Sequence, residues 1–218
     1  MSRHLLLLSR GLGALPEFVE TRVRKHPGAV RVAFVPTAGR ERADSGLVDA
    51  DRRALAAIGY DVHDVDIAEV TGSRLSAALR ESDLVYVADG DVFVLLHHMR
   101  ASGFAWMLPS MLDEGLVYVG TGAGAVVMGP DVSPLTPMHD RASAPDLTST
   151  TGLHLLGVVP LPHADGALFG REVIERVRAQ YAREFHLEPL TDDQAIIVED
   201  DAAAVVESVL VDVASSPG

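Results

Sequence analysis

The segment with the clearest chemical meaning is 119–130, which reads VGTGAGAVVMGP. Small residues between an apolar strand and an apolar helix allow the sharp turn that exposes a nucleophilic side chain in one large class of hydrolases. The centre of such a turn is Gly122, which has no side chain. The pattern also fits a simpler interpretation, in which the glycines only let the helix pack closely on the strand. The segment therefore predicts a strand–turn–helix unit without a nucleophile.

Two aspartates that flank Gly90 could add acid–base chemistry next to this turn. Asp91 directly precedes the apolar stretch 92–94, so it fits the N-cap of a helix, with a position in the pocket as the alternative. Asp89 fits the pocket and the surface equally well. A carboxylate that faces the pocket would bind a cationic group, or would transfer protons together with His163, which follows another apolar stretch.

The elements that must position these residues alternate between short apolar stretches and longer amphipathic ones. This alternation predicts a three-layer α/β/α sandwich with a mostly parallel sheet, in which ligands bind at the carboxyl ends of the strands. The expected strands are 5–8, 30–35, 61–65, 84–87, 117–119 and 156–159, followed by a closing hairpin of 195–198 and 204–211 around residues 199–201. The expected helices are 49–58, 75–79, 92–99 and 171–185.

Two other regions bear on the site. Arg10 follows the first expected strand, where it could meet a substrate carboxylate, and its neighbour Ser9 fits a structural role better than that of a nucleophile. The proline-containing stretch 130–152 predicts a long loop that forms a pocket wall or a lid. We expect one domain over residues 1–213 and a flexible tail over 214–218.

Composition excludes several function classes. The net charge of −13 disfavours nucleic acids and anionic membranes as partners. The chain has no cysteine, so disulfides, thiolate metal sites and a cysteine nucleophile are excluded. The histidines lack the spacing of a metal site, and we expect neither a metal nor another cofactor. No long apolar stretch suggests export or a membrane span, so the cytoplasm is the expected location.

The order of motifs resembles the peptidase E family of serine peptidases, family S51, whose relatives include the cyanophycinases and, more distantly, the class I glutamine amidotransferases. The resemblance covers nearly the whole chain and implies the class I glutamine amidotransferase-like fold. The segments that carry it are 30–39, 49–69, 82–103, 117–132, 157–166 and 190–198.

The resemblance also implies roles for individual residues. The serine nucleophile of the family motif G-x-S-A-G-A corresponds to Gly122, and the family segment G-G-N-T, which shapes the oxyanion region, corresponds to 89–92, DGDV. The family histidine corresponds to His163, and the acid that orients it corresponds to Asp192, with Asp140 as a second candidate. The predicted catalytic residues are His163, Asp192 and Asp89, and the predicted substrate-binding residues are Gly90, Asp91, Thr121, Gly122, Ala123 and Arg10.

Three functions remain open on this basis. The sequence favours a repurposed enzyme that performs non-hydrolytic acid–base chemistry, such as cyclisation, isomerisation or elimination, because a histidine and an acid persist where the serine is missing. The first alternative is an inactive relative that binds a peptide-like ligand or a protein partner, and the second is a working aspartyl dipeptidase with an unseen nucleophile. We expect a small, cationic or peptide-like ligand, and a homodimer stays open.

Overall fold

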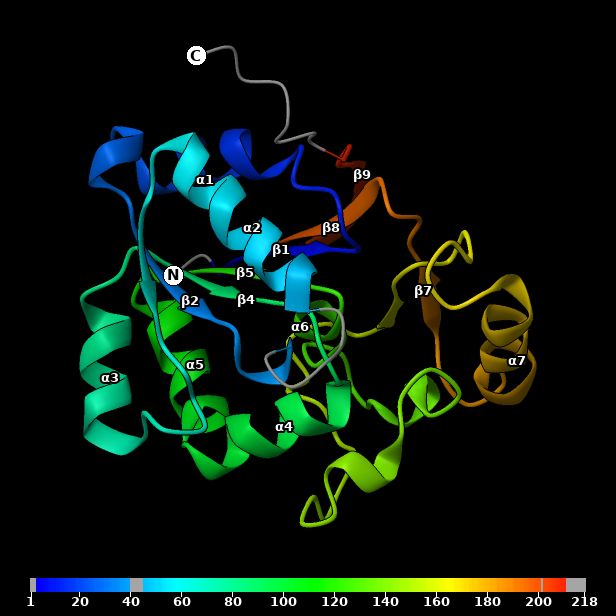
Figure 1. The fold of residues 1–218 in the computed structure, drawn as a ribbon. Helices are drawn as coiled ribbons and strands as arrows, with labels where there is room; N and C mark the ends of the chain where they lie inside the picture. The colour runs from blue at the N-terminus through cyan, green and yellow to red at the C-terminus, as the bar shows by residue number, and fades with distance from the viewer. Residues whose placement is uncertain (1–2, 40–44, 201, 211–218) are drawn as a thin grey trace.

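The computed structural model describes residues 3–39, 45–200 and 202–210. Its centre is a seven-stranded sheet of order β3-β2-β4-β5-β1-β8-β9 (Figure 1). The first five strands of that order are parallel, and β8 and β9 continue the sheet in antiparallel pairing beside β1. The strands are β1 (His4–Leu8), β2 (Arg31–Val35), β3 (Asp61–Asp64), β4 (Leu84–Val87), β5 (Val117–Thr121), β8 (Gln194–Glu199) and β9 (Ala202–Glu207).

Helices cover both faces of this sheet, so the prediction of a three-layer α/β/α sandwich is confirmed. One face carries α1 (Leu15–Val23) and α2 (Ser45–Ile58), and the other carries α3 (Gly72–Arg80), α4 (Val92–Ala101) and α5 (Phe104–Asp113) (Figure 1). The short α6 (Ala123–Val126) follows β5, and α7 (Arg171–Tyr181) lies with β6 (Val159–Leu161) and β7 (Leu187–Pro189) beside the sheet. Single 3₁₀ turns are η1 (Pro27–Ala29), η2 (Thr37–Gly39), η3 (Ser133–Leu135) and η4 (Arg141–Ser143).

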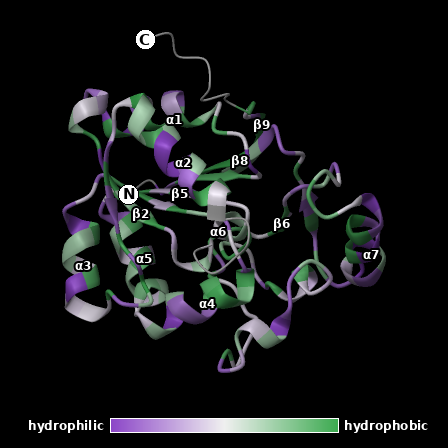
Figure 2. Ribbon diagram, in the orientation of Figure 1, coloured by the Kyte–Doolittle hydropathy of each residue, from purple (hydrophilic) through white to green (hydrophobic). Residues whose placement is uncertain are grey.

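The sheet is held by apolar residues that alternate between two cores. In β1, Leu5 and Leu7 pack on the side of α3, α4 and α5, whereas Leu6 and Leu8 pack on the side of α1 and α2. A strand covered on both faces needs a continuous apolar stretch, which explains why the strands are hydrophobic and the polar residues lie on the outer helices (Figure 2). Each such leucine stabilises the fold by about 1.5–3 kcal/mol relative to an exposed one.

One expected strand lies outside the main sheet. The stretch 156–159 was predicted to be a sheet strand, but the strand β6 begins at Val159 and pairs only with β7. Pro160 lies in the middle of β6 and has no N–H to donate to a second neighbour. In addition, β8 occupies the position beside β1 at which the parallel sheet would have continued.

Two helices, α1 and α5, fall where the sequence predicted no element. Pro16 lies in the first turn of α1, and Pro109 lies inside α5, so each helix contains a residue that normally marks a helix boundary. The predicted helix over 171–185 is shorter in the structure and ends at Tyr181. No helix among the described residues is long and apolar enough to cross a membrane.

The last described residues return to the beginning of the chain. The hairpin of β8 and β9 was predicted, but the second strand ends at Glu207 and Ser208 turns away from the sheet. The Ser208 hydroxyl donates to the carbonyl of Gly11 (2.6 Å) and accepts the N–H of Ala14 (3.1 Å). This contact brings the C-terminal segment against the loop after β1. Residue 211 and the predicted tail 214–218 lie outside the described residues.

Candidate functional site

The turn between β5 and α6 has the predicted strand–turn–helix form. Gly122 connects the strand to the helix with φ 49° and ψ −111°, a conformation that residues with a side chain rarely adopt. A Cβ atom placed on Gly122 would lie well under 3.0 Å from the Oδ1 atom of Asp89. The place where a side chain of residue 122 would stand is therefore filled by the carboxylate of Asp89.

The other small residues of the turn serve close packing. A Cβ on Gly120 would overlap the carbonyl of Gly124, and a Cβ on Gly124 would overlap the carbonyl of Val87 in the neighbouring strand. Both interpretations of the glycine-rich segment therefore hold, because it builds the sharp turn and also lets α6 lie against β4 and β5.

Asp89 follows β4 and joins this turn to a histidine. Its Oδ1 atom accepts the N–H of Ala123 at 2.7 Å, and its Oδ2 atom lies 3.8 Å from Nε2 of His163, an ion-pair distance. In hydrolases with such a turn, the N–H after the central residue stabilises the negative charge that develops on the substrate. Here that N–H is already bonded to a carboxylate.

His163 is buried and held in an unusual backbone conformation. Its φ is 58°, which costs of the order of 1–3 kcal/mol for a non-glycine residue and is typical of functional sites. Its N–H donates to the hydroxyl of Ser9 at 2.9 Å, and that hydroxyl donates in turn to the carbonyl of Leu190 at 3.3 Å. Ser9 therefore has the structural role that the sequence favoured.

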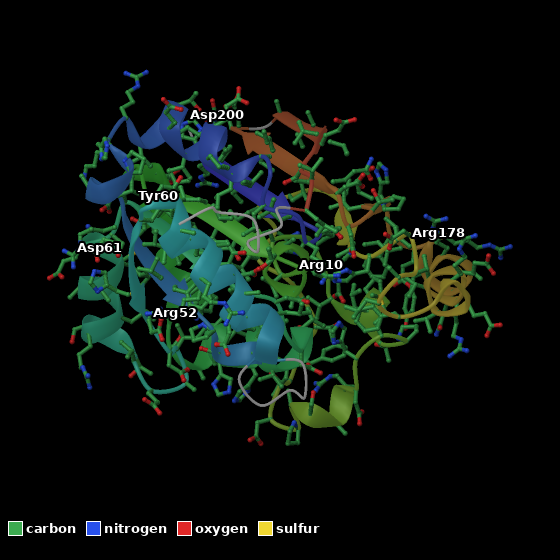
Figure 3. The ribbon with its side chains drawn as sticks, turned by 45° about the horizontal axis from the view of Figure 1, so that its top comes forward. Arg10, Arg52, Tyr60, Asp61, Arg178 and Asp200 are labelled. Carbon is green, nitrogen blue, oxygen red and sulfur yellow. The ribbon has the colours of Figure 1, made fainter. Side chains whose placement is uncertain are left out.

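The structure distinguishes the two candidate partners of His163. The Nδ1 atom of His163 lies 2.6 Å from Oδ1 of Asp192, whereas the carboxylate of Asp140 accepts the N–H of Ala142 and caps a 3₁₀ turn. Arg10 lies 3.5 Å from the other oxygen of Asp192. In Figure 3, Arg10 lies between α2 and the part of the chain that carries α7, and its side chain is 41% exposed.

The three central groups form a carboxylate–imidazolium–carboxylate cluster. Burial lowers the pKa of His163, but the hydrogen bond to Asp192 and the charges of both carboxylates outweigh burial and raise that pKa to about 9. Burial likewise raises the pKa values of Asp89 and Asp192, but the neighbouring imidazolium lowers both overall. At neutral pH the histidine is therefore protonated, and both carboxylates are ionised.

Two more of the predicted site residues, Gly90 and Asp91, make contacts that stabilise the structure around the site. Asp91 caps α4 by accepting the N–H groups of Phe93 and Val94, and Gly90 is enclosed by the backbone of Ala38. The carboxylate of Asp91 also lies 3.8 Å from Nδ1 of His139 in the loop 130–152, but no residue of this loop lines the cavity described below, so a pocket wall or lid formed by it stays a prediction. Gly90 and Asp91 thus have evident structural roles, and substrate binding by them stays a prediction.

One further acid at the site, Asp51 of α2, was not predicted from the sequence. Its Oδ2 atom accepts the hydroxyl of Tyr86 at 2.8 Å and lies 3.3 Å from the hydroxyl of Thr121. Asp51 was overlooked because it lies in the charged stretch 49–53, DADRR, which suggests a solvated surface. The signal that could have found it is helical spacing, because residue 51 shares a face with the fully buried Leu55 one turn later.

These residues surround a small cavity of about 130 Å³. Such a volume equals that of about four water molecules, so it accepts a small ligand or the head group of a larger one. Aliphatic side chains line part of it. The polar and charged side chains around it belong to Ser9, Arg10, Asp51, Asp89, Thr121 and His163.

Comparison with known proteins identifies the scaffold. The family model for peptidase family S51 matches residues 5–206. The chain belongs to this family. An uncharacterized peptidase of Listeria innocua is 28% identical over 199 residues, which cover 91% of this chain and 94% of that protein. Peptidase E of Streptomyces coelicolor is 32% identical over 168 residues, which cover 73% of this chain and 63% of that protein.

A solved structure agrees with this assignment. The crystal structure of a protein assigned to peptidase E, from Listeria monocytogenes EGD-e, matches with a TM-score of 0.85 at 26% identity and covers 95% of this S51 chain and 99% of its own. A peptidase from an acI-B1 Actinobacterium shares the fold, with a TM-score of 0.71 at 18% identity. The predicted family and architecture are confirmed.

The ion cluster predicts that the protein loses stability as the pH rises above neutrality. The folded-state pKa of His163, about 9, exceeds its ordinary value of 6.5, so protonation stabilises the fold fully below pH 6.5 and no longer does so once the pH has passed 9. The free energy of unfolding should fall by up to about 3 kcal/mol over this range. Urea unfolding at several pH values measures the change.

The variant His163→Gln should lose most of this slope. His186→Gln is the matched control, because His186 is exposed and lies outside the cluster. An unchanged slope in His163→Gln would contradict the assignment of the raised pKa to this cluster.

Proposed function

We propose that this chain is a peptidase S51 scaffold without the serine nucleophile, and that it performs proton-transfer chemistry on a small amino-acid- or peptide-derived substrate. Cyclisation, isomerisation and elimination are the reactions in question. The observation that carries the proposal is the carboxylate of Asp89, which fills the space beside Gly122 and takes the N–H of Ala123.

Serine-peptidase chemistry fits this arrangement poorly. Loss of a triad nucleophile costs about 10⁶-fold in rate in well-studied enzymes. The nearby hydroxyls have other partners, because Thr121 contacts Asp51 and Tyr86, and Ser9 supports the backbone of His163. A donor to the oxyanion is worth about 3–4 kcal/mol, whereas the Asp89 carboxylate would repel such a charge.

The cluster suits proton donation instead. The imidazolium of His163 is held by Asp192 through Nδ1, which leaves Nε2–H on the side of Asp89 and the cavity. From there it can donate a proton to a substrate oxygen or nitrogen, or polarise a carbonyl group. The nearby carboxylates favour a substrate that carries a positive charge on another group.

One observation also favours the alternative of a ligand-binding protein without turnover. His163 and its two carboxylates neutralise one another in part, and such an ion cluster is stable without performing any reaction. In this case the cavity would bind a cationic or peptide-like ligand and release it unchanged.

The loss of the nucleophile can be tested by restoring it. Gly122→Ser alone should not react with a fluorophosphonate probe, because the new side chain would overlap Asp89. The double variant Gly122→Ser/Asp89→Gly frees both this space and the Ala123 N–H, so it should become labelled at residue 122. Intact-mass spectrometry of the proteins after exposure to the probe measures this. Labelling of the unaltered protein at any pocket hydroxyl would refute the proposal.

Turnover should depend on His163. The protein is incubated with a panel of aspartyl dipeptides, N-acyl amino acids, amino-acid amides and cyclic dipeptides, and products are followed by NMR and mass spectrometry. We expect a mass-neutral product or a loss of water or ammonia, and His163→Gln should slow this at least about 100-fold. His186→Gln, whose folding is verified by circular dichroism, should retain the rate.

The same assay separates the competing functions. Cleavage of a peptide bond would favour the dipeptidase alternative. Saturable binding of panel members without any conversion would favour the binding protein.

A further inference from the structure

A second carboxylate, that of Asp51, faces the same cavity from helix α2. Both hydrogen-bond contacts of this carboxylate are made by Oδ2, with the hydroxyl of Tyr86 at 2.8 Å and that of Thr121 at 3.3 Å. Among the described residues, no hydrogen bond engages Oδ1. The carboxylate is therefore anchored through one oxygen, while the other is available to a ligand.

The orientation of Asp51 is specific to this residue of the helix. Asp49 is exposed, and the exposed Arg52 pairs with Asp64 of β3. Asp51 instead turns inward, among aliphatic lining residues that include Leu12 and Leu47. Turning an acid toward an apolar wall costs free energy that a solvated position on the same helix would avoid.

Satisfying the phenol of Tyr86 does not by itself require this acid. The Tyr86 hydroxyl also lies 3.3 Å from Oγ1 of Thr121, which in turn lies 3.5 Å from the carbonyl of Val87. A neutral amide at position 51 would accept the phenolic hydrogen equally well. What a carboxylate adds is the ability to take up a proton.

We propose that Asp51 is the proton acceptor of this site, working opposite His163. The assignment rests on the proposed acid–base function. His163 Nε2–H polarises a substrate carbonyl and donates its proton to the developing anion, while Oδ1 of Asp51 takes a proton from the carbon next to that carbonyl. The C–H bond breaks, and its electron pair enters the carbonyl system, so substrate composition is unchanged at this step.

The cycle closes by a return of protons. After the step, Asp51 is protonated and His163 is neutral. One proton leaves Asp51 for solvent and one returns to His163, which restores both groups. Where the substrate carries a leaving group on the next carbon, the enol proton returns to His163, the carbonyl re-forms and the electron pair forms a C=C bond. The leaving group departs with the electrons of its own bond and takes up the proton from Asp51, so the reaction is an elimination.

The environments of the two groups support these opposite roles. Burial and the charge of Asp89 raise the pKa of Asp51 to about 7, although the hydroxyls of Tyr86 and Thr121 and the charge of Arg10 oppose the rise. The pKa of His163 is about 9. Between these values Asp51 is ionised and His163 is protonated, so the reaction rate should be bell-shaped, with limbs near pH 7 and pH 9.

The test measures proton removal directly. The same panel of dipeptides, N-acyl amino acids, amides and cyclic dipeptides is incubated in D₂O, and loss of the signal of the hydrogen next to each carbonyl is followed by NMR. The protein should exchange at least one member, and Asp51→Asn should slow this exchange by about 10²–10⁴-fold. Asp49→Asn, two residues away and exposed, is the matched control and should exchange at the unaltered rate.

Two further measurements exclude a merely structural role. Tyr86→Phe removes a hydrogen bond that lowers the pKa of Asp51, so it should move the acidic limb of the exchange profile to higher pH. Infrared difference spectra should show a protonated carboxyl band that titrates near pH 7 and disappears in Asp51→Asn but not in Asp49→Asn. Thermal unfolding verifies that each variant is folded.

The outcomes separate the two proposals. Exchange by Asp51→Asn at the unaltered rate, or a carboxyl band that persists in it, would overturn the role of Asp51 and leave the proposed function standing. Absence of exchange and of any conversion by the unaltered protein would overturn both. Loss of exchange in Asp51→Asn with a shifted limb in Tyr86→Phe would support the assignment.

Discussion

The contact between the carboxylate of Asp89 and the N–H of Ala123 determines the character of this site. It places a negative charge where a related hydrolase would develop one only during reaction. A buried carboxylate is costly unless it is paired, and His163 supplies the positive charge at 3.8 Å. Asp192 orients the ring of His163, and the other oxygen of Asp192 faces the partly exposed side chain of Arg10. Negative and positive groups therefore alternate from Asp89 through His163 and Asp192 to Arg10. This series begins with the Asp89 carboxylate, which occupies the space where residue 122 has no side chain.

The pKa values of two acids in the same cavity, Asp89 and Asp51, shift in opposite directions because the groups around them differ. Asp89 lies beside an imidazolium and a backbone N–H, which together lower its pKa despite burial. Among the described residues, Asp51 receives hydrogen bonds from hydroxyl groups alone and lies among aliphatic side chains, and burial together with the charge of Asp89 raises its pKa to about 7 despite the opposing charge of Arg10. Environments that push the pKa values of neighbouring groups apart are how enzymes assign acid and base roles to similar side chains. The sheet makes this possible by bringing β4 and β5 next to each other below α2.

Much of this arrangement was predictable from the sequence because it depends on local pattern. Buried strands are continuous apolar stretches, and the glycines of 119–130 predicted a sharp turn. The sequence could not say whether Asp89 faced the pocket, since that depends on the space left by Gly122 in the turn after β5. For Asp51 the sequence offered only its helical spacing from Leu55, which indicates an inward-facing position but not the contacts with Tyr86 and Thr121 that form on folding. The strand predicted at 156–159 does not join the main sheet, because β8 pairs with β1 where a further parallel strand would have been added. No local sequence pattern encodes which of two strands takes that place.

The contact of Ser208 with the loop after β1 links the two ends of the described chain. It holds the following residues against that loop, and Leu210 becomes part of the cavity wall. During synthesis the whole sheet core emerges before this segment does. A growing chain can therefore assemble its charged cluster while one wall of the cavity is still missing. Within the described residues, the side chain that completes the cavity wall is therefore made after all the charged residues that it helps to enclose.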